Sequence, residues 1–528
     1  MATAESSSKY SPFSRDRLIL PLVIFILAGC ETRYQASFIH PHPPGKPFHE
    51  CSVDLEPYKS VQTRQTTQDP NLALALAVSG GGLRAANLTA GAMLGLEKIT
   101  KDGSPNKNVL NEVDYFSTVS GGGFAVAAYI STLHDHLRFG GSYNDYSFTR
   151  AFYPPSCPNR PPTQCPYTQV PPSNQTHDPC IKWHLQQFYH KIAKMILTDI
   201  LPWEKLGLSD RGSRLEQAID DDLLGYKWRL KKLESLNYTL PQKTSLTLGD
   251  IFVPRDEQTT AKLPYWFTNA TVYENGAIFT FTPKHFQIYD IRSYIHRFDT
   301  YKYDPDKQDY TDFAAGIPLS LGVRASSTFP IFIPPTLLRS EMDEHNPYLY
   351  LLDGGVADNL GITTAIRLLE NEPYENVTHK TLIVIDAFNG TFASFSNVDE
   401  TSIFTTGLKL TKDTFVDSQR ARYRKIVNGL CQSRKIQPLY ISFDDLANLS
   451  CCCPLIDFGL TSQNVTALYE QYSQDPEFGM PPTPFKLLRS IPTISTKLSP
   501  AQQNLLLAAG KYLVNQKRDN IQQQLGWK

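Results

Sequence analysis

The sequence predicts an α/β fold in which a mostly parallel central sheet carries helices on both faces. Two observations lead to this prediction. A continuous apolar run is twice followed by a glycine-rich turn and then by apolar residues at helical spacing, and further apolar runs occur later in the chain. Strands covered by helices on both faces are typically continuous apolar runs, so the pattern indicates a parallel sheet in three layers.

The first predicted strand spans 72–78 (LALALAV) and leads through Ser79 into three glycines at 80–82. Apolar residues then recur at helical spacing, which predicts a helix. The second unit repeats this order, with a strand at 115–119, a turn at 120–123 and a helix from Phe124.

Later apolar runs at 348–352 and 381–388 predict two more strands. Between the second unit and these runs, Asn275-Gly276 separates two aromatic and β-branched stretches within 266–283, which predicts a hairpin. The chain is expected to close with a helix over about 500–525. Four apolar residues lie on one side of that helix: Leu505, Leu506, Ala509 and Leu513.

The segment from about 134 to 245 interrupts this alternation and is interpreted as an insertion with its own role. Its first part is rich in proline and cysteine, and its second part is predicted to be helical. Apolar residues at 181, 185, 188, 192 and 195 form a stripe, and Lys182, His190, Lys191 and Lys194 lie off it. Such a helix either packs on the core, which is slightly favoured, or lies on an anionic membrane.

The N-terminus has the pattern of an export signal over 1–29. Basic residues precede the apolar run 18–28, which is shorter than the roughly 20 residues that span a bilayer. The run ends in Leu27-Ala28-Gly29-Cys30, which resembles the lipobox of bacterial lipoproteins and implies fatty acylation of Cys30. The alternatives are an ordinary signal peptide or a short buried helix.

These features predict three regions: a signal peptide over 1–29, a polar tether over 30–71 and a folded domain over 72–525. Glu31 after the cysteine favours the outer membrane of a bacterial cell envelope as the place of the lipid anchor. The formal net charge of -1 lacks the basic excess expected for nucleic-acid binding.

Besides Cys30, the chain has eight further cysteines, an even number that suits disulfides in an oxidising compartment. A metal site is the rival interpretation because Cys451, Cys452 and Cys453 are consecutive. Thiolate metal sites usually contain Cys-x-x-Cys pairs, and the sequence has none, so disulfides are favoured.

A serine that attacks an ester needs a sharp turn that exposes it, a base nearby and backbone donors for the oxyanion. Ser120 lies between a predicted strand and helix and is followed by Gly121 and Gly122, as at a nucleophile elbow. Thr118 stands where G-x-S-x-G has its first glycine. The alternative is an ordinary glycine-rich helix start.

Gly80, Gly81 and Gly82 place consecutive backbone N–H groups at the start of a helix, which suits an oxyanion hole. A nucleotide loop would require G-x-G-x-x-G or G-x-x-x-x-G-K-[ST], and neither pattern is present. Arg84 either adds positive charge beside these N–H groups or is a solvated helix residue.

Asp353 ends an apolar run and is followed by Gly354 and Gly355. Its carboxylate is therefore expected at the end of a strand, where the sites of open α/β sheets gather. The alternative is a turn residue whose side chain bonds its own backbone.

Together these motifs resemble the patatin-like phospholipase family, over 72–133 and 245–388. The family order is a Gly-Gly-Gly-x-Arg loop, a serine elbow and an Asp-Gly-Gly or Asp-Gly-Ala turn. Two further likenesses are the segment 324–330 (RASSTFP) and Asn359. Two departures are Ser79, expected to be neutral, and Thr118, which puts the catalytic rate in doubt.

The resemblance implies a serine hydrolase that needs no metal or cofactor and acts on membrane lipids or other acyl esters. Ser120 and Asp353 would form a dyad, and Gly80, Gly81, Gly82 and Arg84 would build the oxyanion hole. The rival is a Ser-Asp-His triad with His379, which follows Asp353 in the right chain order but lies in a polar stretch that is expected to be exposed.

The activity expected from the resemblance is hydrolysis of fatty acyl esters of phospholipids or lysophospholipids. Two alternatives stay open: an envelope lipoprotein of the same fold with weak catalysis that serves as an interaction protein, and an esterase or thioesterase for soluble acyl substrates.

Overall fold

The structure is a computed structural model. It describes residues 69–138, 141–153, 181–198, 211–225, 245–252, 263–295, 300–302, 310–329, 333–340, 345, 347–370, 377–388, 420, 425, 428–429, 436–447, 455–472, 483–492 and 498–528.

In the described part of the chain, ten strands form one sheet and two short strands form a separate pair. The order in the main sheet is β12-β11-β1-β4-β5-β10-β9-β7-β8, and β6 pairs with β5. The strands are β1 (Leu72–Val78), β2 (Thr100–Lys101), β3 (Ser104–Asn108), β4 (Tyr115–Val119), β5 (Tyr265–Val272), β6 (Ile278–Thr280), β7 (Ile291–Ile295), β8 (Thr300–Lys302), β9 (Thr336–Ser340), β10 (Tyr348–Asp353), β11 (His379–Asp386) and β12 (Ile436–Ser442).

The strands from β12 to β5 run parallel, as predicted from the continuous apolar runs. Every residue of β1 and β4 is buried, because helices cover both faces of this half of the sheet. Val78 of β1 pairs with Thr118 of β4 and with Ile385 of β11. The residues that follow these three strands therefore meet at one edge of the sheet.

The other half of the sheet is antiparallel, which the sequence did not reveal. The predicted hairpin is confirmed: β5 and β6 pair antiparallel around Asn275 and Gly276, whose φ of 71° suits glycine. The predicted run at 348–352 is also a strand, but β10 runs antiparallel to β5 and β9. Consequently its residues alternate in burial, and Tyr350 is 42% exposed.

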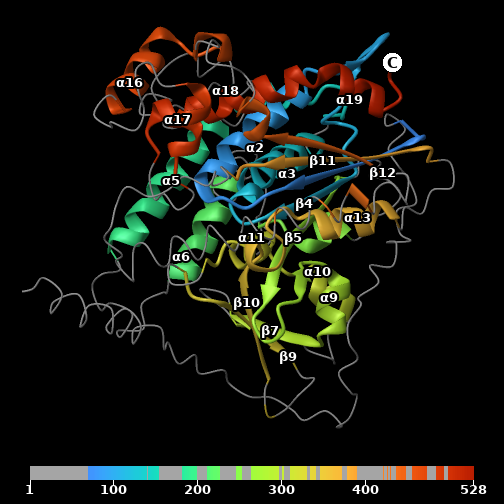
Figure 1. Ribbon diagram of the computed structural model, residues 1–528. Helices are drawn as coiled ribbons and strands as arrows, with labels where there is room; N and C mark the ends of the chain where they lie inside the picture. The colour runs from blue at the N-terminus through green and yellow to red at the C-terminus, as the bar shows by residue number, and fades with distance from the viewer. Residues whose placement is uncertain are drawn as a thin grey trace, which may run out of the picture.

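The helices of the described residues surround this sheet (Figure 1). They are α2 (Gly82–Leu96), α3 (Gly122–Arg138), α4 (Phe148–Phe152), α5 (Ile181–Thr198), α6 (Arg211–Ala218), the π-helix η3 (Ile219–Leu223), α8 (Leu248–Phe252), α9 (Pro283–Ile288), α10 (Tyr310–Ala315), α11 (Leu319–Ser326), α12 (Gly355–Asp358), α13 (Ile362–Glu370), α15 (Asp444–Ala447), the 3-10 helix η5 (Leu455–Phe458), α16 (Ser462–Tyr472), α17 (Pro484–Ser490), α18 (Pro500–Gln516) and α19 (Arg518–Gln524).

Helices α2, α3 and α18 lie on one face of the parallel strands, and α13 lies on the other (Figure 1). This arrangement confirms the predicted α/β class with helices on both faces. Helix α18 packs closely on α2: a Cβ atom added at Gly91 would lie 2.2 Å from the Leu507 carbonyl oxygen. Glycine at this position lets the two helix backbones approach.

The predicted final helix is two helices. It begins as expected at Pro500, after a capping box formed by Ser499 and Gln502, and its apolar side is buried. It breaks at Lys517, whose backbone leaves helical geometry and whose ammonium group donates to the Tyr440 carbonyl oxygen and to Asp445. The expectation of one continuous helix over 500–525 is therefore wrong.

In the insertion, the predicted helix is α5, and its apolar stripe packs on the core. Ile181, Leu185, Phe188 and Met195 are buried, and Ile192 is partly buried. The Phe188 ring meets Phe124 of α3 edge to face, with ring centroids 4.8 Å apart. The interpretation of α5 as a core helix is confirmed, and this stripe is unavailable for a membrane.

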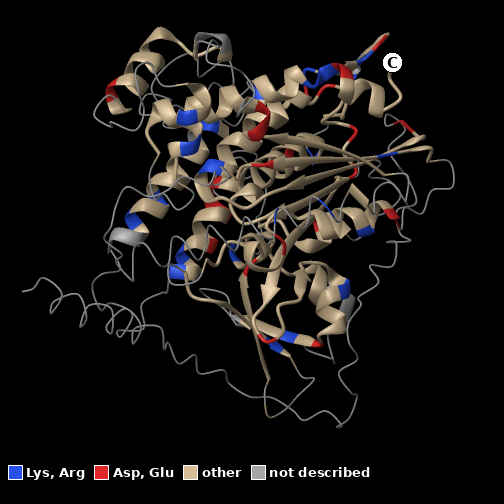
Figure 2. Ribbon diagram, in the orientation of Figure 1, with Lys and Arg blue, Asp and Glu red and all other residues tan. Residues whose placement is uncertain are grey.

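A buried ion pair also ties the insertion to α11, a helix that packs on β5. Arg324 of α11 donates to Glu216 of α6 at 3.0 Å, and both side chains are almost fully buried. Basic and acidic residues otherwise lie mainly on helices and loops, while the central strands are mostly uncharged (Figure 2). In this view the two signs are interspersed.

Candidate active site

The structure places Ser120 on a sharp turn between β4 and α3. Its φ of 49° lies in the left-handed region, which costs a residue with a side chain about 1 kcal/mol or more. Among the described residues only Ser120 and Asp290 combine a side chain with positive φ. This strained geometry is that of a nucleophile elbow, which presents the serine hydroxyl at the sheet edge.

The glycines beside Ser120 are required by close packing. A Cβ atom at Gly121 would lie 2.1 Å from the Gly82 carbonyl oxygen, and one at Gly122 would lie 2.4 Å from that of Ser79. The elbow therefore lies directly against the triple-glycine loop. Any side chain at these two positions would push the two loops apart.

Thr118 is accommodated at the position where glycine was expected. Its hydroxyl accepts a hydrogen bond from the Trp266 indole N–H at 2.9 Å. The same hydroxyl lies 3.3 Å from where a Cβ atom of Gly123 would be. The glycine at 123 therefore leaves the space that Thr118 occupies, and the elbow keeps its shape.

Ser120 and Asp353 are brought together although 233 residues separate them. The Ser120 hydroxyl donates to Asp353 Oδ2 at 2.8 Å, and the backbone N–H of Gly355 donates to Oδ1 at 2.8 Å. Gly354 is equally constrained, since a Cβ atom there would lie 2.1 Å from the Asn269 carbonyl oxygen. The Asp-Gly-Gly turn thus fixes the carboxylate against the serine.

Burial raises the pKa of Asp353 from 3.8 to about 6, against the opposing effect of the hydrogen bonds from Gly355 and Ser120. The carboxyl group is therefore ionised at neutral pH but far more basic than a solvated aspartate. Such a carboxylate is suited to accept the proton of the serine hydroxyl.

The triple-glycine loop offers fewer free donors than expected. The N–H of Gly80 donates to the Asn359 carbonyl oxygen at 2.9 Å, so this group is already used. Gly81 and Gly82 have φ values of 143° and 56°, and their N–H groups make no hydrogen bond with another described residue. Of the three glycines predicted to bind the oxyanion, Gly81 and Gly82 are therefore the better candidates for donors; a role of these N–H groups or of Arg84 in binding an oxyanion stays a prediction.

Arg84 is buried and holds a neighbouring helix. Its side chain is fully buried, and Nη1 donates to the Ile491 carbonyl oxygen at 2.9 Å, at the end of α17. The expectation of a solvated residue is therefore wrong. This guanidinium hydrogen bond holds α17 against the start of α2.

Ser326 takes part in the site in a way that the sequence motif did not specify. Its hydroxyl accepts the backbone N–H of Ser120 at 2.8 Å and donates to the Asn269 carbonyl oxygen at 2.6 Å. It thereby fixes the backbone of the elbow. The sequence pointed to Ser326 only through its place in the segment 324–330, which resembles the corresponding segment of the family.

His379 and Ser120 lie at opposite ends of the parallel strands. It is the first residue of β11 and pairs with Leu72, whereas Ser120 follows the strand end at which Val78 pairs with Thr118. Six residues of strand correspond to about 20 Å. A triad that uses His379 is therefore excluded.

Several expectations lie outside the described residues: the signal peptide, Cys30 and the other eight cysteines. Of the predicted tether over 30–71, only 69–71 are described. Asp69 is buried there, and its backbone N–H donates to Glu112 at 2.6 Å, so the end of the predicted tether lies against the folded domain. Among the described helices, none combines the length and hydrophobicity needed to cross a bilayer. Within the same residues, no group of three or more potential ligands is placed to hold a metal ion.

Comparison with known proteins relates the chain to a family and to solved structures. The patatin-like phospholipase family model matches residues 76–366, which is more than half of the chain. The structure of human GIVD cytosolic phospholipase A2 is similar with a TM-score of 0.33 and 13% identity, over 87% of this chain and 60% of that one. The chain thus spans about 60% of the length of that human enzyme. No curated protein matches the sequence.

The triple-glycine loop, the serine elbow and the Asp-Gly-Gly turn all lie within the matched region and meet at one edge of the sheet. The chain belongs to the patatin-like phospholipase family.

Proposed function

We propose that this protein is a serine lipid acyl hydrolase that cleaves fatty acyl esters of phospholipids or lysophospholipids through a Ser120–Asp353 dyad. The observation that carries the proposal is the 2.8 Å hydrogen bond between the serine hydroxyl and the buried carboxylate. Family membership supports the class of reaction.

In the proposed reaction, Asp353 accepts the hydroxyl proton as Ser120 Oγ attacks the ester carbonyl carbon. The carbonyl oxygen becomes an oxyanion, which the N–H groups of Gly81 and Gly82 stabilise. When the C–O bond breaks, Asp353 returns the proton to the leaving alcohol. Water then attacks the acyl-enzyme, with Asp353 again accepting and returning the proton, and releases the fatty acid.

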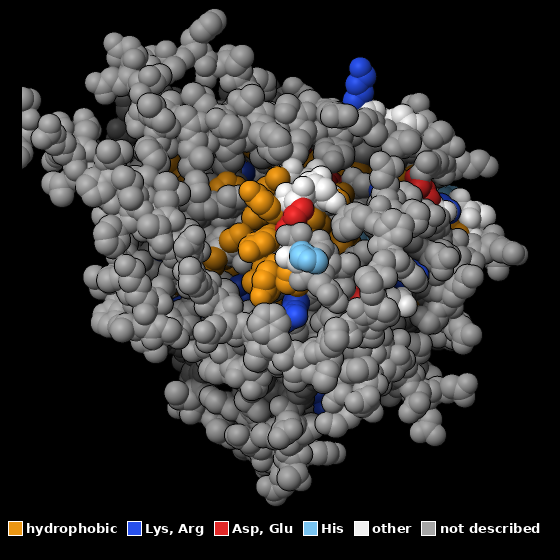
Figure 3. Space-filling model, turned by 90° about the horizontal axis from the view of Figure 1, so that it is seen from below, with side chains coloured by type: hydrophobic (Ala, Val, Ile, Leu, Met, Phe, Trp, Pro, Cys, Tyr) orange, Lys and Arg blue, Asp and Glu red, His pale blue; other side chains and the backbone are white. Residues whose placement is uncertain are grey.

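Two exposed aromatic side chains support a lipid substrate. Tyr273 and Tyr350 are 67% and 42% exposed, and their ring centroids lie 6.4 Å apart. Tyr350 precedes Asp353 by three residues on β10, which corresponds to about 10 Å along a strand. Aromatic side chains with polar tips suit contact with a lipid–water interface. Figure 3 shows hydrophobic side chains gathered at the centre of the face seen from below.

The proposal is tested with purified protein, a fluorophosphonate probe, phospholipid vesicles and a soluble short-chain ester. We expect the probe to label Ser120 and the protein to release fatty acid from vesicles, and Ser120→Ala to abolish both. Labelling with activity on the soluble ester alone would favour a soluble-substrate esterase. Neither labelling nor hydrolysis would overturn the enzymatic proposal and favour an interaction protein.

We also propose that the protein is anchored through Cys30 in a bacterial cell envelope, at the outer membrane. The apolar run followed by Leu27-Ala28-Gly29-Cys30 supports this proposal. A single acyl chain binds membranes only marginally, whereas a lipoprotein cysteine carries several. In a bacterial host, Cys30→Ala should abolish labelling by fatty acid and leave uncleaved precursor. Absence of label on the unchanged protein would refute the anchor.

A further inference from the structure

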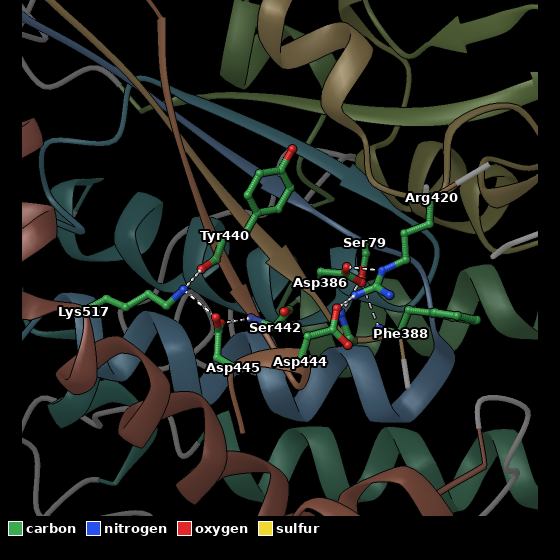
Figure 4. A network of polar contacts seen from close by, with 10 residues as sticks. Ser79, Asp386, Phe388, Arg420, Tyr440, Ser442, Asp444, Asp445 and Lys517 are labelled. Atoms are coloured by element: carbon green, nitrogen blue, oxygen red, sulfur yellow. Dashed lines mark hydrogen bonds and ion pairs between the residues drawn. The ribbon is translucent and has the colours of Figure 1, made fainter. Parts of the chain in front are cut away.

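Ser79 connects the triple-glycine loop to the neighbouring strand β11. Its side chain is fully buried. The hydroxyl accepts the backbone N–H of Ala387 at 2.9 Å and donates to the Gly80 carbonyl oxygen at 3.1 Å, in the network of Figure 4. It therefore joins the end of β11 to the loop that carries the proposed oxyanion donors.

The Gly80 carbonyl and the Gly81 N–H belong to the same planar peptide unit. In a trans peptide these two groups point in opposite directions. A hydrogen bond that holds the Gly80 carbonyl therefore also fixes the direction of the Gly81 N–H. The preceding peptide is held as well, because the Gly80 N–H donates to Asn359. Without these two bonds, successive glycines would permit many orientations of the peptide.

The strand end that holds Ser79 is itself fixed by buried charges. Asp386 is fully buried and accepts the Phe388 N–H at 3.0 Å and Arg420 Nε at 2.5 Å. Arg420 Nη2 also donates to Asp444 at 2.6 Å, and the guanidinium group lies over the Phe388 ring. Figure 4 shows this cluster beside Ser79. Ala387 therefore lies between Asp386 and Phe388, and both of these residues are fixed by their contacts with Arg420.

Arg420 keeps its charge in this position. Burial opposes the charged form, but the neighbouring carboxylates of Asp386 and Asp444 outweigh it and raise the pKa of Arg420. Charge-assisted hydrogen bonds of this kind are short and strong, so the cluster holds the end of β11 in place.

We propose that Ser79 is a positioning residue that aims the Gly81 N–H at the oxyanion, with the Asp386–Arg420–Asp444 cluster as its anchor. This inference rests on the proposed function. It replaces the expectation from the sequence that Ser79 is neutral. Ser79 acts through the loop and does not touch the substrate.

The test compares Ser79→Ala with Ser79→Thr on a soluble ester. A donor that matters only in the transition state changes kcat and leaves KM largely unchanged. We expect Ser79→Ala to lower kcat by about 10- to 100-fold with KM within about twofold of the parent. Ser79→Thr keeps the hydroxyl and should restore most of kcat. If either variant fails to reach the parent's Tm, Ser79→Cys, a weaker donor of similar size, should give an intermediate kcat.

A matched control is Ser340→Ala on β9. The Ser340 hydroxyl also donates to a backbone carbonyl oxygen, that of Tyr289 at 2.6 Å, but at a distant part of the sheet. The Ser340→Ala variant should keep the kcat of the parent. A second readout is the acid side of the pH profile of kcat/KM, which reports the base. Ser79→Ala should lower the plateau without moving the midpoint, because the serine–aspartate pair stays intact.

The outcomes separate this inference from the proposed function. A parent without Ser120-dependent hydrolysis overturns the proposed function and, with it, the role of Ser79. An active parent whose folded Ser79→Ala variant keeps kcat within about twofold overturns only the role of Ser79. Two further results would contradict positioning through the loop. One is a shifted midpoint of the pH profile in Ser79→Ala, and the other is a folded Ser79→Thr variant that does not recover kcat.

Discussion

Asp353→Asn removes a buried charge while keeping the size of the side chain, so it should stabilise the fold and abolish the activity. Burial raises the pKa of Asp353 from 3.8 to about 6, partly offset by hydrogen bonds from Gly355 and Ser120. A carboxyl group with a raised folded-state pKa binds its proton more tightly in the folded protein. Its ionisation therefore lowers the free energy of unfolding as pH rises from about 4 to 6.

A pKa raised by about two units corresponds to about 3 kcal/mol in the free energy of unfolding. The parent loses this stabilisation in full above about pH 6. Asparagine carries no charge and recovers this energy. At pH 8 we expect the Tm of Asp353→Asn to exceed that of the parent by about 3 °C or more. Near pH 4 the carboxyl group is protonated in the folded parent, so the difference should nearly disappear. The assay is thermal unfolding of both proteins at the two pH values.

Asp145→Asn is a control at a largely exposed carboxylate whose pKa is shifted in the opposite direction. Burial alone would raise the pKa of Asp145, but hydrogen bonds from His136 and Ser142 lower it to about 2. Its replacement should therefore not raise the Tm at pH 8. A Tm of Asp353→Asn at or below that of the parent at pH 8, or an equal gain at pH 4, would refute the account of Asp353.

Three further predictions concern the base, the loop and the insertion. The pH profile of kcat/KM should fall on the acid side with a midpoint of about 6, because only ionised Asp353 accepts the serine proton; a flat profile from about pH 5 to 8 would contradict this. Gly81→Ala should lower kcat by about 100-fold, since φ is 143° and the added Cβ atom would lie 3.2 Å from that of Ala85; unchanged kcat in a folded variant would count against Gly81 as a donor. Met195→Asp places a charge in the core beneath α5, so Tm and activity on both vesicles and soluble esters should fall; loss of vesicle activity alone would instead indicate a membrane-binding helix.

The parallel half of the sheet could be predicted because its strands are buried on both faces. Leu72–Val78 is apolar at every position, which is typical of a strand between two helical layers. The antiparallel direction of β10 could not be predicted, because a short apolar run does not specify its neighbours. In the structure β10 pairs antiparallel with β5, which lies far before it in the chain, and with β9, and its outward residues are partly exposed.

The residues of the candidate site could be found where local sequence dictates local geometry. The glycines beside Ser120 and Asp353 are examples, since each permits a tight turn after a strand. The Ser120–Asp353 contact was expected from the family resemblance, but contacts between distant segments that no motif marks could not be predicted. Ser326 meets the Ser120 backbone across 206 residues, and Arg84 meets Ile491 across 407 residues. The commitment of the Gly80 N–H to Asn359 depends on the same kind of long-range packing.

The central claim is that Ser120 and Asp353 act as one catalytic unit. The most direct measurement compares hydrolysis by Ser120→Ala, Asp353→Asn and the double mutant, each confirmed as folded by a Tm at or above that of the parent. Residues that act as a unit are strongly non-additive, so all three rates should fall to a similar residual level, by a factor of about 10³ or more. Retention of most of the parent's activity by folded Asp353→Asn would contradict the dyad.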